Sequence, residues 1–422
     1  MRFMHIADIH LGYQQYGLTE RFNDFGRMFL HLVDVALAEK VNFVLLAGDL
    51  FEKRAVDPLA MRVAVEGFAQ LQGAGVPVLA VEGNHERSHY KDQYSWIDFL
   101  DALGYIRLLN PRFTEDGAHL MPHGEEGGAY SDLGNGVRVY GMKYYGASTR
   151  KALSLLADSL AKMDHSQVRY TILMTHAGVE GQMSHVGGAS FDELSPLRTH
   201  IDYLALGHFH KPFCIDDWCY NPGSPETWSM DEVEWPERGY YLVDILPTRN
   251  PKHRAQVVAP PRRPFHRFTL AVDTFTTPNS VYDAVRALIS REDRRVVRNP
   301  QPIIELTLTG ILPFSRYDLE LDYVQGLLAE AWSPLGPPHV VNRAVPAEFE
   351  IDVDSQASRG ELEEAIVQGL LERDVRFRAG SDVWTEGALE LKRLGAGNSP
   401  SDEVIAFLRQ LRHETASLKG DG

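Results

Sequence analysis

Five short apolar runs in the first 245 residues constrain the fold more than any other feature of this chain. Each run reads as a buried strand and ends at a polar residue of a ligand type. The runs are residues 3–7 before Asp8, 43–47 before Gly48-Asp49, 78–81 before Gly83-Asn84-His85, 171–174 before Thr175-His176, and 203–206 before Gly207-His208. Helical patterns alternate with the runs, which predicts a layered α/β domain. Because ligands of open α/β sheets bind outside the carboxyl ends of the strands, we expect one shared site there.

The length of 422 residues predicts two or three domains. A proline-rich break at residues 259–264 marks a domain boundary. We therefore predict a first domain over 1–264, a smaller α+β domain over 265–350 and a helical tail over 351–422.

The smaller domain and the tail are predicted from local patterns. Expected elements of the smaller domain are strands at 268–272, 303–308 and 339–342 and helices at 281–289 and 318–328. In the tail, Leu362, Ile366 and Leu370 share one helical face, and Ser399 before Pro400 is typical of a helix N-terminus. The tail either offers a surface to a partner or packs against its own domain.

Composition narrows the cellular setting. No stretch is apolar enough to span a membrane, and the N-terminus becomes charged before a signal-peptide core can form, so we expect a cytoplasmic protein. Cys214 and Cys219 are too few for a disulfide scaffold or a cysteine-based zinc site, and we expect free thiols. The net charge of -16 argues against a general nucleic-acid coat protein. Attraction to a nucleic acid would have to be local, for example through bound divalent cations.

The first polar clusters suit cation binding. Asp8 and His10 lie two residues apart at a strand end, on the same side of an extended segment. Asp49 follows a glycine that lets the backbone approach a ligand, so its carboxylate could bridge two cations. Taken alone, these residues are better explained as turn and surface residues. Asn84 supplies an oxygen for a hard cation, and the adjacent His85 is free for acid chemistry.

Three further imidazoles strengthen this interpretation. His176 ends one predicted strand, and His208 and His210 follow the next, two residues apart. A single histidine on a strand is more often structural than a ligand. Three at two strand ends, after the earlier carboxylates, are hard to explain by chance.

In this order the motifs Asp-x-His, Gly-Asp, Gly-Asn-His, Thr-His and Gly-His-x-His resemble those of the calcineurin-like metallophosphoesterase superfamily. Within it, residues 8–12, 47–51, 82–86 and 206–212 resemble the SbcD family, the bacterial relatives of the break-repair nuclease of eukaryotes and archaea. The motifs span residues 8–210, and the rest of the chain matches mainly in layout.

The resemblance implies a layered sandwich fold with two divalent metal ions, manganese first, with magnesium or iron also compatible with the ligands. Asp49 would bridge the ions, and His85 would stay outside the metal shell and protonate the leaving 3′-oxygen. The implied ligands are Asp8, His10, Asp49 and His210 for one metal and Asp49, Asn84, His176 and His208 for the other.

One position departs from the family pattern. Many relatives carry histidine three residues after the bridging aspartate, where this chain has Glu52. A carboxylate there would repel phosphate and alter rate or substrate preference. The alternative is an exposed residue without a role.

Candidate DNA contacts fall into two groups. Tyr13 and Gln15 follow the first motif and would touch the sugar-phosphate backbone, or else belong to an exposed loop without contacts. Arg262, Arg263 and Arg267 would bind phosphate near the smaller domain, or else form a solvated basic patch.

The resemblance also implies partners. The chain would form a homodimer through helices near residues 58–71 and 94–103, unless these are buried within the monomer. No Walker A motif occurs, so an SbcC-type ATPase would supply ATP-driven opening of DNA, with the tail docked on its coiled coil. The smaller domain would cap the DNA, and the protein would associate with the nucleoid.

The resulting hypothesis is a DNA nuclease of repair, recombination and replication that acts on DNA ends and hairpins. It would be a 3′-to-5′ exonuclease on duplexes and an endonuclease on single strands and hairpins. Two alternatives stay open: a phosphodiesterase or phosphatase of small nucleotides, and a DNA-end tether that does not cut.

Overall fold

The computed structural model describes residues 1–87, 94–125, 128–183, 187–346, 358–373, 377–378, 380–397 and 401–417. The chain divides into two compact units. Unit 1 comprises residues 1–266 and 299–303, and unit 2 comprises residues 267–298 and 304–422. The predicted boundary near residue 264 lies close to this division. The predicted boundary at 350/351, and the predicted helix start at Ser399 and Pro400, lie outside the described residues.

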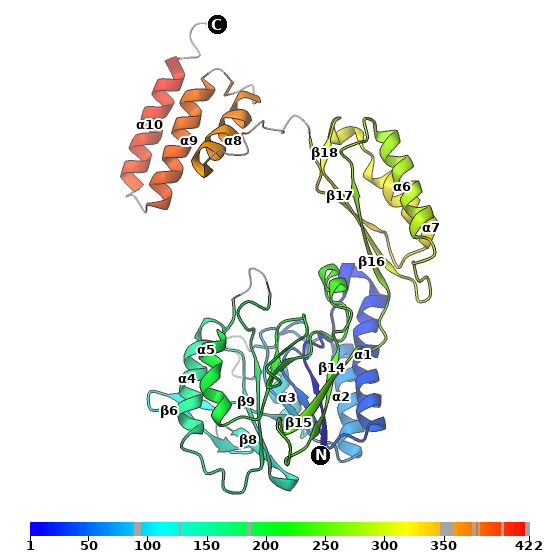
Figure 1. Ribbon diagram of the computed structural model, residues 1–422, viewed down its shortest axis with the longest axis vertical. Coiled ribbons are helices and arrows are strands. Elements are labelled where there is room, and N and C mark those ends of the chain that lie inside the picture. Colours follow the sequence, from blue (N-terminus) through cyan, green and yellow to red (C-terminus); the bar gives the residue numbers. More distant parts are fainter. Residues whose placement is uncertain are drawn as a thin grey trace. The chain divides into compact units, whose positions relative to one another are not determined.

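Unit 1 contains two large sheets (Figure 1). The first has the order β15-β14-β1-β2-β3-β4 and the second the order β12-β13-β11-β10-β9-β8-β7. The strands of the first sheet are β1 (Arg2–Ile6), β2 (Phe43–Leu46), β3 (Val78–Ala80), β4 (Arg107–Leu108), β14 (Tyr240–Ile245) and β15 (His253–Val258). Those of the second are β7 (Met121–Pro122), β8 (Gly128–Leu133), β9 (Val137–Met142), β10 (Tyr170–His176), β11 (Tyr203–Gly207), β12 (Phe213–Ile215) and β13 (Cys219–Asn221). A separate short hairpin joins β5 (Arg112–Thr114) to β6 (Gly117–His119).

Side-chain alternation along β1 explains the layering. Phe3 belongs to the core between the two sheets, together with Phe43 of β2 and Ile172 of β10. Met4 and Ile6 point to the opposite face and pack in a second core with the helices. Successive side chains of a strand face opposite sides, so a strand covered on both faces must be apolar throughout.

Helices cover the outer face of each sheet. The first sheet is covered by α1 (Thr19–Ala38), α2 (Pro58–Gly73) and α3 (Trp96–Ala102), and the second by α4 (Thr149–Leu160) and α5 (Phe191–Leu194). At the start of α2 the Asp57 side chain accepts a hydrogen bond from Leu59 N at 2.7 Å, and Pro58 occupies the first turn. The predicted layered α/β sandwich is confirmed.

Unit 2 begins with a three-stranded sheet in the order β16-β17-β19. The strands are β16 (Phe265–Ala271), β17 (Ile303–Thr309) and β19 (His339–Asn342), and they pack with α6 (Pro278–Glu292) and α7 (Leu321–Trp332). Two short strands, β18 (Ile311–Leu312) and β20 (Val345–Pro346), pair beside them. Every predicted element of this α+β module is present.

Three helices follow, α8 (Arg359–Arg373), α9 (Ser381–Ala396) and α10 (Ser401–Ser417). Leu394 and Leu411 are buried, whereas Ile366, Leu370, Ile405 and Leu408 are each about 45% exposed. The predicted helical tail is therefore confirmed, and it packs in part on itself. Across the described residues we find no helix with the length and apolarity needed to cross a membrane.

Candidate metal centre

The strand ends of unit 1 bring the predicted ligands together. Asp8 and His10 follow β1, Asp49 follows β2, and His208 follows β11. These four residues have positive φ angles of 55°, 52°, 54° and 94°. Such backbone is costly for residues other than glycine and concentrates at functional sites, where the surrounding structure enforces it.

Two glycines allow these loops to approach one another. A Cβ atom on Gly83 would lie 2.0 Å from Asp49 Oδ1, and one on Gly48 would lie 2.4 Å from His176 Nδ1. Glu86 then ties the loops together, because its carboxylate accepts the N–H of Phe51 at 2.9 Å and that of Gly83 at 3.0 Å. Burial, together with the nearby Asp49, raises the pKa of Glu86 to about 8.

One half of the centre is formed by Asp8, His10 and His210. The Nε2 atoms of the two histidines face each other at 3.1 Å, and Asp8 Oδ1 lies 4.0 Å from His210 Nε2. The other half is formed around Asn84, whose Oδ1 lies 2.9 Å from both His176 Nε2 and His208 Nδ1.

Asp49 lies at the centre of this arrangement. Its Oδ2 is 3.2 Å from His176 Nε2, and its Oδ1 accepts the N–H of His85 at 3.0 Å. Asp8, Asp49 and His176 offer ligand atoms that all lie within 4.8 Å of one another, and so do Asp8, His10 and His210. Nitrogen and oxygen atoms of ligand type therefore converge on one place, and the set, which includes no thiolate, fits divalent cations.

A second group lies beside the outward-facing nitrogen of three rings. His10 Nδ1 lies 2.9 Å from Glu52 Oε2, His210 Nδ1 lies 2.7 Å from Glu232 Oε1, and His176 Nδ1 lies 2.7 Å from the carbonyl oxygen of Ala47. Metal-binding histidines are commonly oriented in this way, by a carboxylate or a backbone carbonyl on the other nitrogen. This arrangement supports the fit of the donor set to metal ions.

The electrostatics of the centre favour positive charge. Burial by itself lowers the pKa of His176 and of His210, but Asp49 and Glu232 respectively outweigh burial and raise each pKa to about 9. His208 is the exception, because burial and the neighbouring His176 lower its pKa to about 3.

His85 lies beside the centre. Its Nδ1 is 2.8 Å from the carbonyl oxygen of Glu52, and its ring lies edge-on to His10 with the centroids 4.8 Å apart. His10, Glu52 and His85 also lie close enough together to be considered as a cation site. We interpret them as a polar cluster, because His10 Nδ1 lies at ion-pair distance from Glu52 and His85 Nδ1 is hydrogen-bonded to the Glu52 carbonyl oxygen.

A cavity of about 620 Å³ opens onto this centre. Asp49, Asn84, His85, His208 and His210 line one side of it. The residues of the other walls include Lys211, Met183, Trp228 and Trp235.

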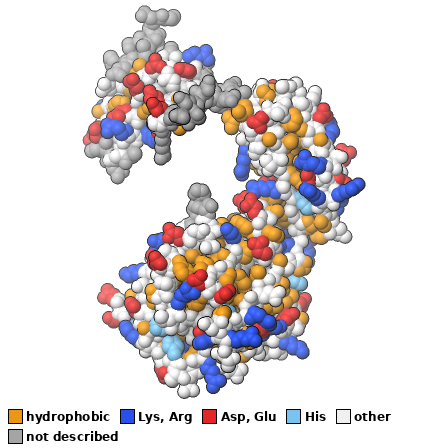
Figure 2. Space-filling model, in the orientation of Figure 1, with side chains coloured by type: hydrophobic (Ala, Val, Ile, Leu, Met, Phe, Trp, Pro, Cys, Tyr) orange, Lys and Arg blue, Asp and Glu red, His pale blue; other side chains and the backbone are white. Residues whose placement is uncertain are grey.

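On the face of unit 1 drawn in Figure 2, acidic and basic side chains are interspersed and do not form a basic band.

The structure changes the interpretation of Glu52. Its side chain is only 10% exposed and contacts His10 and Trp228. The alternative of an exposed surface residue is therefore wrong. The carboxylate is engaged by imidazole and indole groups and is not directed freely at a phosphate.

The candidate DNA contacts are also revised. Gln15 is 1% exposed and donates to the carbonyl oxygen of Trp228, so it does not lie on an exposed loop. Tyr13 is partly buried and stacks on the Trp228 indole with the ring centroids 5.3 Å apart. Both side chains support Trp228, which lines the cavity.

The three arginines have protein partners. Arg263 is buried and pairs with Asp24, and Arg267 pairs with Glu305. Arg262 donates to three backbone carbonyl groups, among them that of Arg238 at 2.7 Å. These contacts explain the arginines without DNA, and we do not propose them as phosphate contacts.

Sequence reasoning missed Glu232 and Trp228. Glu232 accepts hydrogen bonds from Ser224, Trp228 and Ser229 in addition to its contact with His210. The only signal was the spacing of Ser229 and Glu232, which form a capping box. That pattern predicts a helix start and carries no information about a distant histidine.

A two-sheet sandwich with such a centre at its strand ends defines a metal-dependent phosphoesterase. The family model for calcineurin-like phosphoesterases matches residues 1–212, and the chain belongs to this family. Curated relatives include the DNA double-strand break repair protein Mre11 of Saccharolobus solfataricus, 27% identical over 323 residues, or 74% of this chain and 75% of the relative. The protein of the same name from Aeropyrum pernix is 28% identical over 333 residues, or 75% of each chain. That of Archaeoglobus fulgidus is 38% identical over 239 residues, or 55% of this chain and 52% of the relative.

Proposed function

We propose that the chain is a two-metal DNA nuclease, the SbcD-type subunit of a complex that processes DNA ends and hairpins. The observation that carries the proposal is the convergence of seven candidate ligand side chains at the strand ends of unit 1. Four of them, Asp49, Asn84, His208 and His210, line one cavity together with His85. The names of the curated relatives support DNA double-strand breaks as the setting.

The chain's residues divide the work. Asp8, His10, Asp49 and His210 would hold one cation, and Asp49, Asn84, His176 and His208 the other. When bound, two such cations activate water and stabilise the charge that develops on the phosphate. Manganese is the proposed metal, because the oxygen and imidazole donors suit it.

His85 would supply the proton. Its Nδ1 is engaged by the carbonyl oxygen of Glu52 at 2.8 Å, so Nδ1 carries a hydrogen and Nε2 is left to face the substrate. The protonated ring would then donate from Nε2 to the leaving 3′-oxygen. General acid catalysis of this kind contributes roughly 100-fold to 10,000-fold.

The surface of α2 and α3 supports the proposed homodimer. Leu59, Tyr94, Trp96 and Leu103 are 52%, 56%, 44% and 50% exposed. Large exposed apolar side chains are typical of interaction surfaces when they form one patch. The exposed apolar residues of α8 and α10 support the tail as the binding site for an SbcC-type ATPase. Residues 265–350 would form the DNA-capping domain.

Cleavage of end-labelled duplex and hairpin DNA with manganese, magnesium or EDTA tests the proposal. Wild-type protein should cut in manganese, and His85→Ala should bind DNA but cut at least 100-fold more slowly. Efficient hydrolysis of a small phosphodiester without any DNA cleavage would favour the small-nucleotide enzyme. Binding of ends without cutting under every condition would favour the tether.

A further inference from the structure

Glu52 contacts two histidines of the site through different atoms. Its side-chain Oε2 lies 2.9 Å from His10 Nδ1, and its backbone oxygen lies 2.8 Å from His85 Nδ1. The same Oε2 also accepts a hydrogen bond from Trp228 Nε1 at 3.0 Å. A histidine at position 52 could not take both contacts, because a neutral imidazole has a single acceptor nitrogen.

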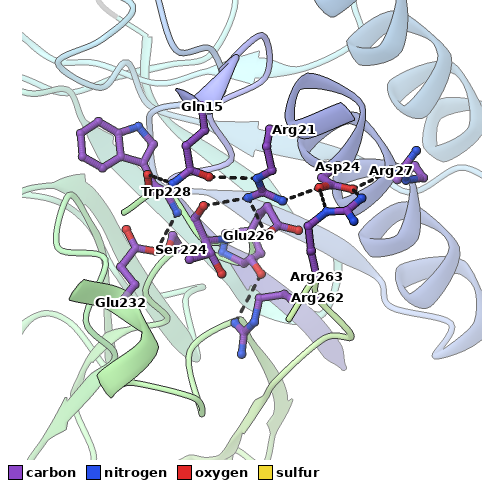
Figure 3. A network of polar contacts seen from close by, with 12 residues as sticks. Gln15, Arg21, Asp24, Arg27, Ser224, Glu226, Trp228, Glu232, Arg262 and Arg263 are labelled. Carbon is purple, nitrogen blue, oxygen red and sulfur yellow. Dashed lines mark hydrogen bonds and ion pairs between the residues drawn. The ribbon is translucent and has the colours of Figure 1, made fainter. Parts of the chain in front are cut away.

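Trp228 is held firmly in the position from which it reaches Glu52. Its backbone N–H donates to Glu232 at 2.9 Å, and its carbonyl oxygen accepts from Gln15 at 2.8 Å (Figure 3). The indole stacks on Tyr13 with an interplanar angle of 21°. The direction of its N–H is therefore fixed from several sides.

A buried arginine holds the segment that precedes Trp228. Arg21 is fully buried and donates to Glu226 at 3.0 Å and to the carbonyl oxygen of Thr227 at 2.9 Å. Figure 3 shows Arg21 between Gln15, Glu226 and Asp24. This network links α1 to the wall of the metal centre.

We propose that Glu52 is a positioning residue that fixes the ring of His10 with Nε2 facing the metal position, and that Trp228 in turn fixes Glu52. The inference rests on the proposed metal centre. An anionic partner also makes an imidazole a stronger metal ligand. His10 and His210 both have carboxylate partners, whereas His176 has a neutral carbonyl, so the half built on Asp8, His10 and His210 should bind its cation more tightly.

Binding of manganese by the metal-free protein, followed by the electron paramagnetic resonance signal of free Mn²⁺ without DNA, tests this inference. Glu52→Ala should weaken the tighter binding step by about 10-fold to 100-fold. Glu52→Gln should weaken it less, because an amide oxygen can keep the contact with His10 and the hydrogen bond from Trp228. Trp228→Phe keeps an aromatic ring but removes the N–H donor, and it should also weaken manganese binding. Glu115→Gln, at an exposed position, is the matched control and should bind like wild type.

The outcomes separate this inference from the proposed function. Unchanged manganese affinity in Glu52→Ala would overturn the positioning role, and absence of binding by wild type would overturn the metal centre itself. Excess manganese should restore DNA cleavage to Glu52→Ala, because that variant keeps the backbone carbonyl that holds His85. It should not restore cleavage to His85→Ala, which lacks the proposed proton donor. Circular dichroism checks folding, and if Glu52→Ala fails to fold, Glu52→Gln and Trp228→Phe decide the matter.

Discussion

Arg263 pairs with Asp24 across 239 residues of sequence, with Nε 2.6 Å from Oδ2 and Nη2 3.0 Å from Oδ1. Both side chains are less than a tenth exposed. Arg263, which lies nearest the predicted domain boundary, therefore stabilises unit 1 through its contact with α1. Removing Arg263 leaves the buried Asp24 carboxylate with one partner fewer.

Arg263→Ala should lower the free energy of unfolding by about 1.5 to 3 kcal/mol, the usual range for hydrogen bonds to a charged group. The loss is limited because Arg21 and Arg27 still pair with Asp24. Chemical denaturation measures this effect. Arg254 pairs with Asp244 but is 72% exposed, so Arg254→Ala should cost only about 0 to 1 kcal/mol. Equal losses for the two variants would contradict the buried pair.

Stability in acid should depend on Asp24. Burial raises its pKa, but hydrogen bonds and charges from Arg263 and Arg21 outweigh burial and hold the pKa below its ordinary value of 3.8. A pKa lower in the folded than in the unfolded state gives stability that is present above the unfolded value and is lost as pH falls through the folded value. Unfolding measured from about pH 5 down to pH 2 should show a steeper loss for wild type than for Asp24→Asn. Identical slopes would exclude this contribution.

Gly83→Ala should disable the metal centre. The added Cβ would lie 2.0 Å from Asp49 Oδ1, so the proposed bridging carboxylate must move. We expect at least a 10-fold loss of manganese affinity by calorimetry, the lower end of what disturbed ligand support costs. Gly73→Ala is the control, because a Cβ there meets no atom within 4 Å. Wild-type manganese affinity in Gly83→Ala would show that the loops of Gly83 and Asp49 can move apart without weakening metal binding.

The proposed dimer depends on apolar residues of α3 and the segment before it. Replacing Trp96 with serine and Leu103 with glutamate places polar groups in that surface and should convert a dimer to a monomer in sedimentation experiments. Tyr317→Ser is a control of similar character, since Tyr317 is 82% exposed in unit 2. A monomeric wild type would refute the proposed interface.

Local sequence patterns were sufficient to predict the strands and the convergence of their ends. A short run such as residues 43–47, which is apolar at every position and is followed by Gly48, predicts a strand that is covered on both faces. The partners of the ligands were not predictable in this way. The contact of Glu232 with His210 spans 22 residues and that of Trp228 with Glu52 spans 176, and neither pair belongs to a repeating pattern.

The same limit applies to the arginines near residue 264. A basic cluster beside a proline-rich break is equally compatible with phosphate binding and with buried pairing. Only the position of Asp24 on α1 decides between them, and that position depends on tertiary packing.

The ligand histidines of the second sheet lie far along the chain from those of the first. His10 and His210 are separated by 200 residues, as are Asp8 and the backbone of His208 that it binds. During synthesis the N-terminal ligands thus emerge long before their counterparts, and loop closure of this length must precede any complete ligand set. No complete ligand set can therefore exist until His210 has been synthesised and the two sheets have come together.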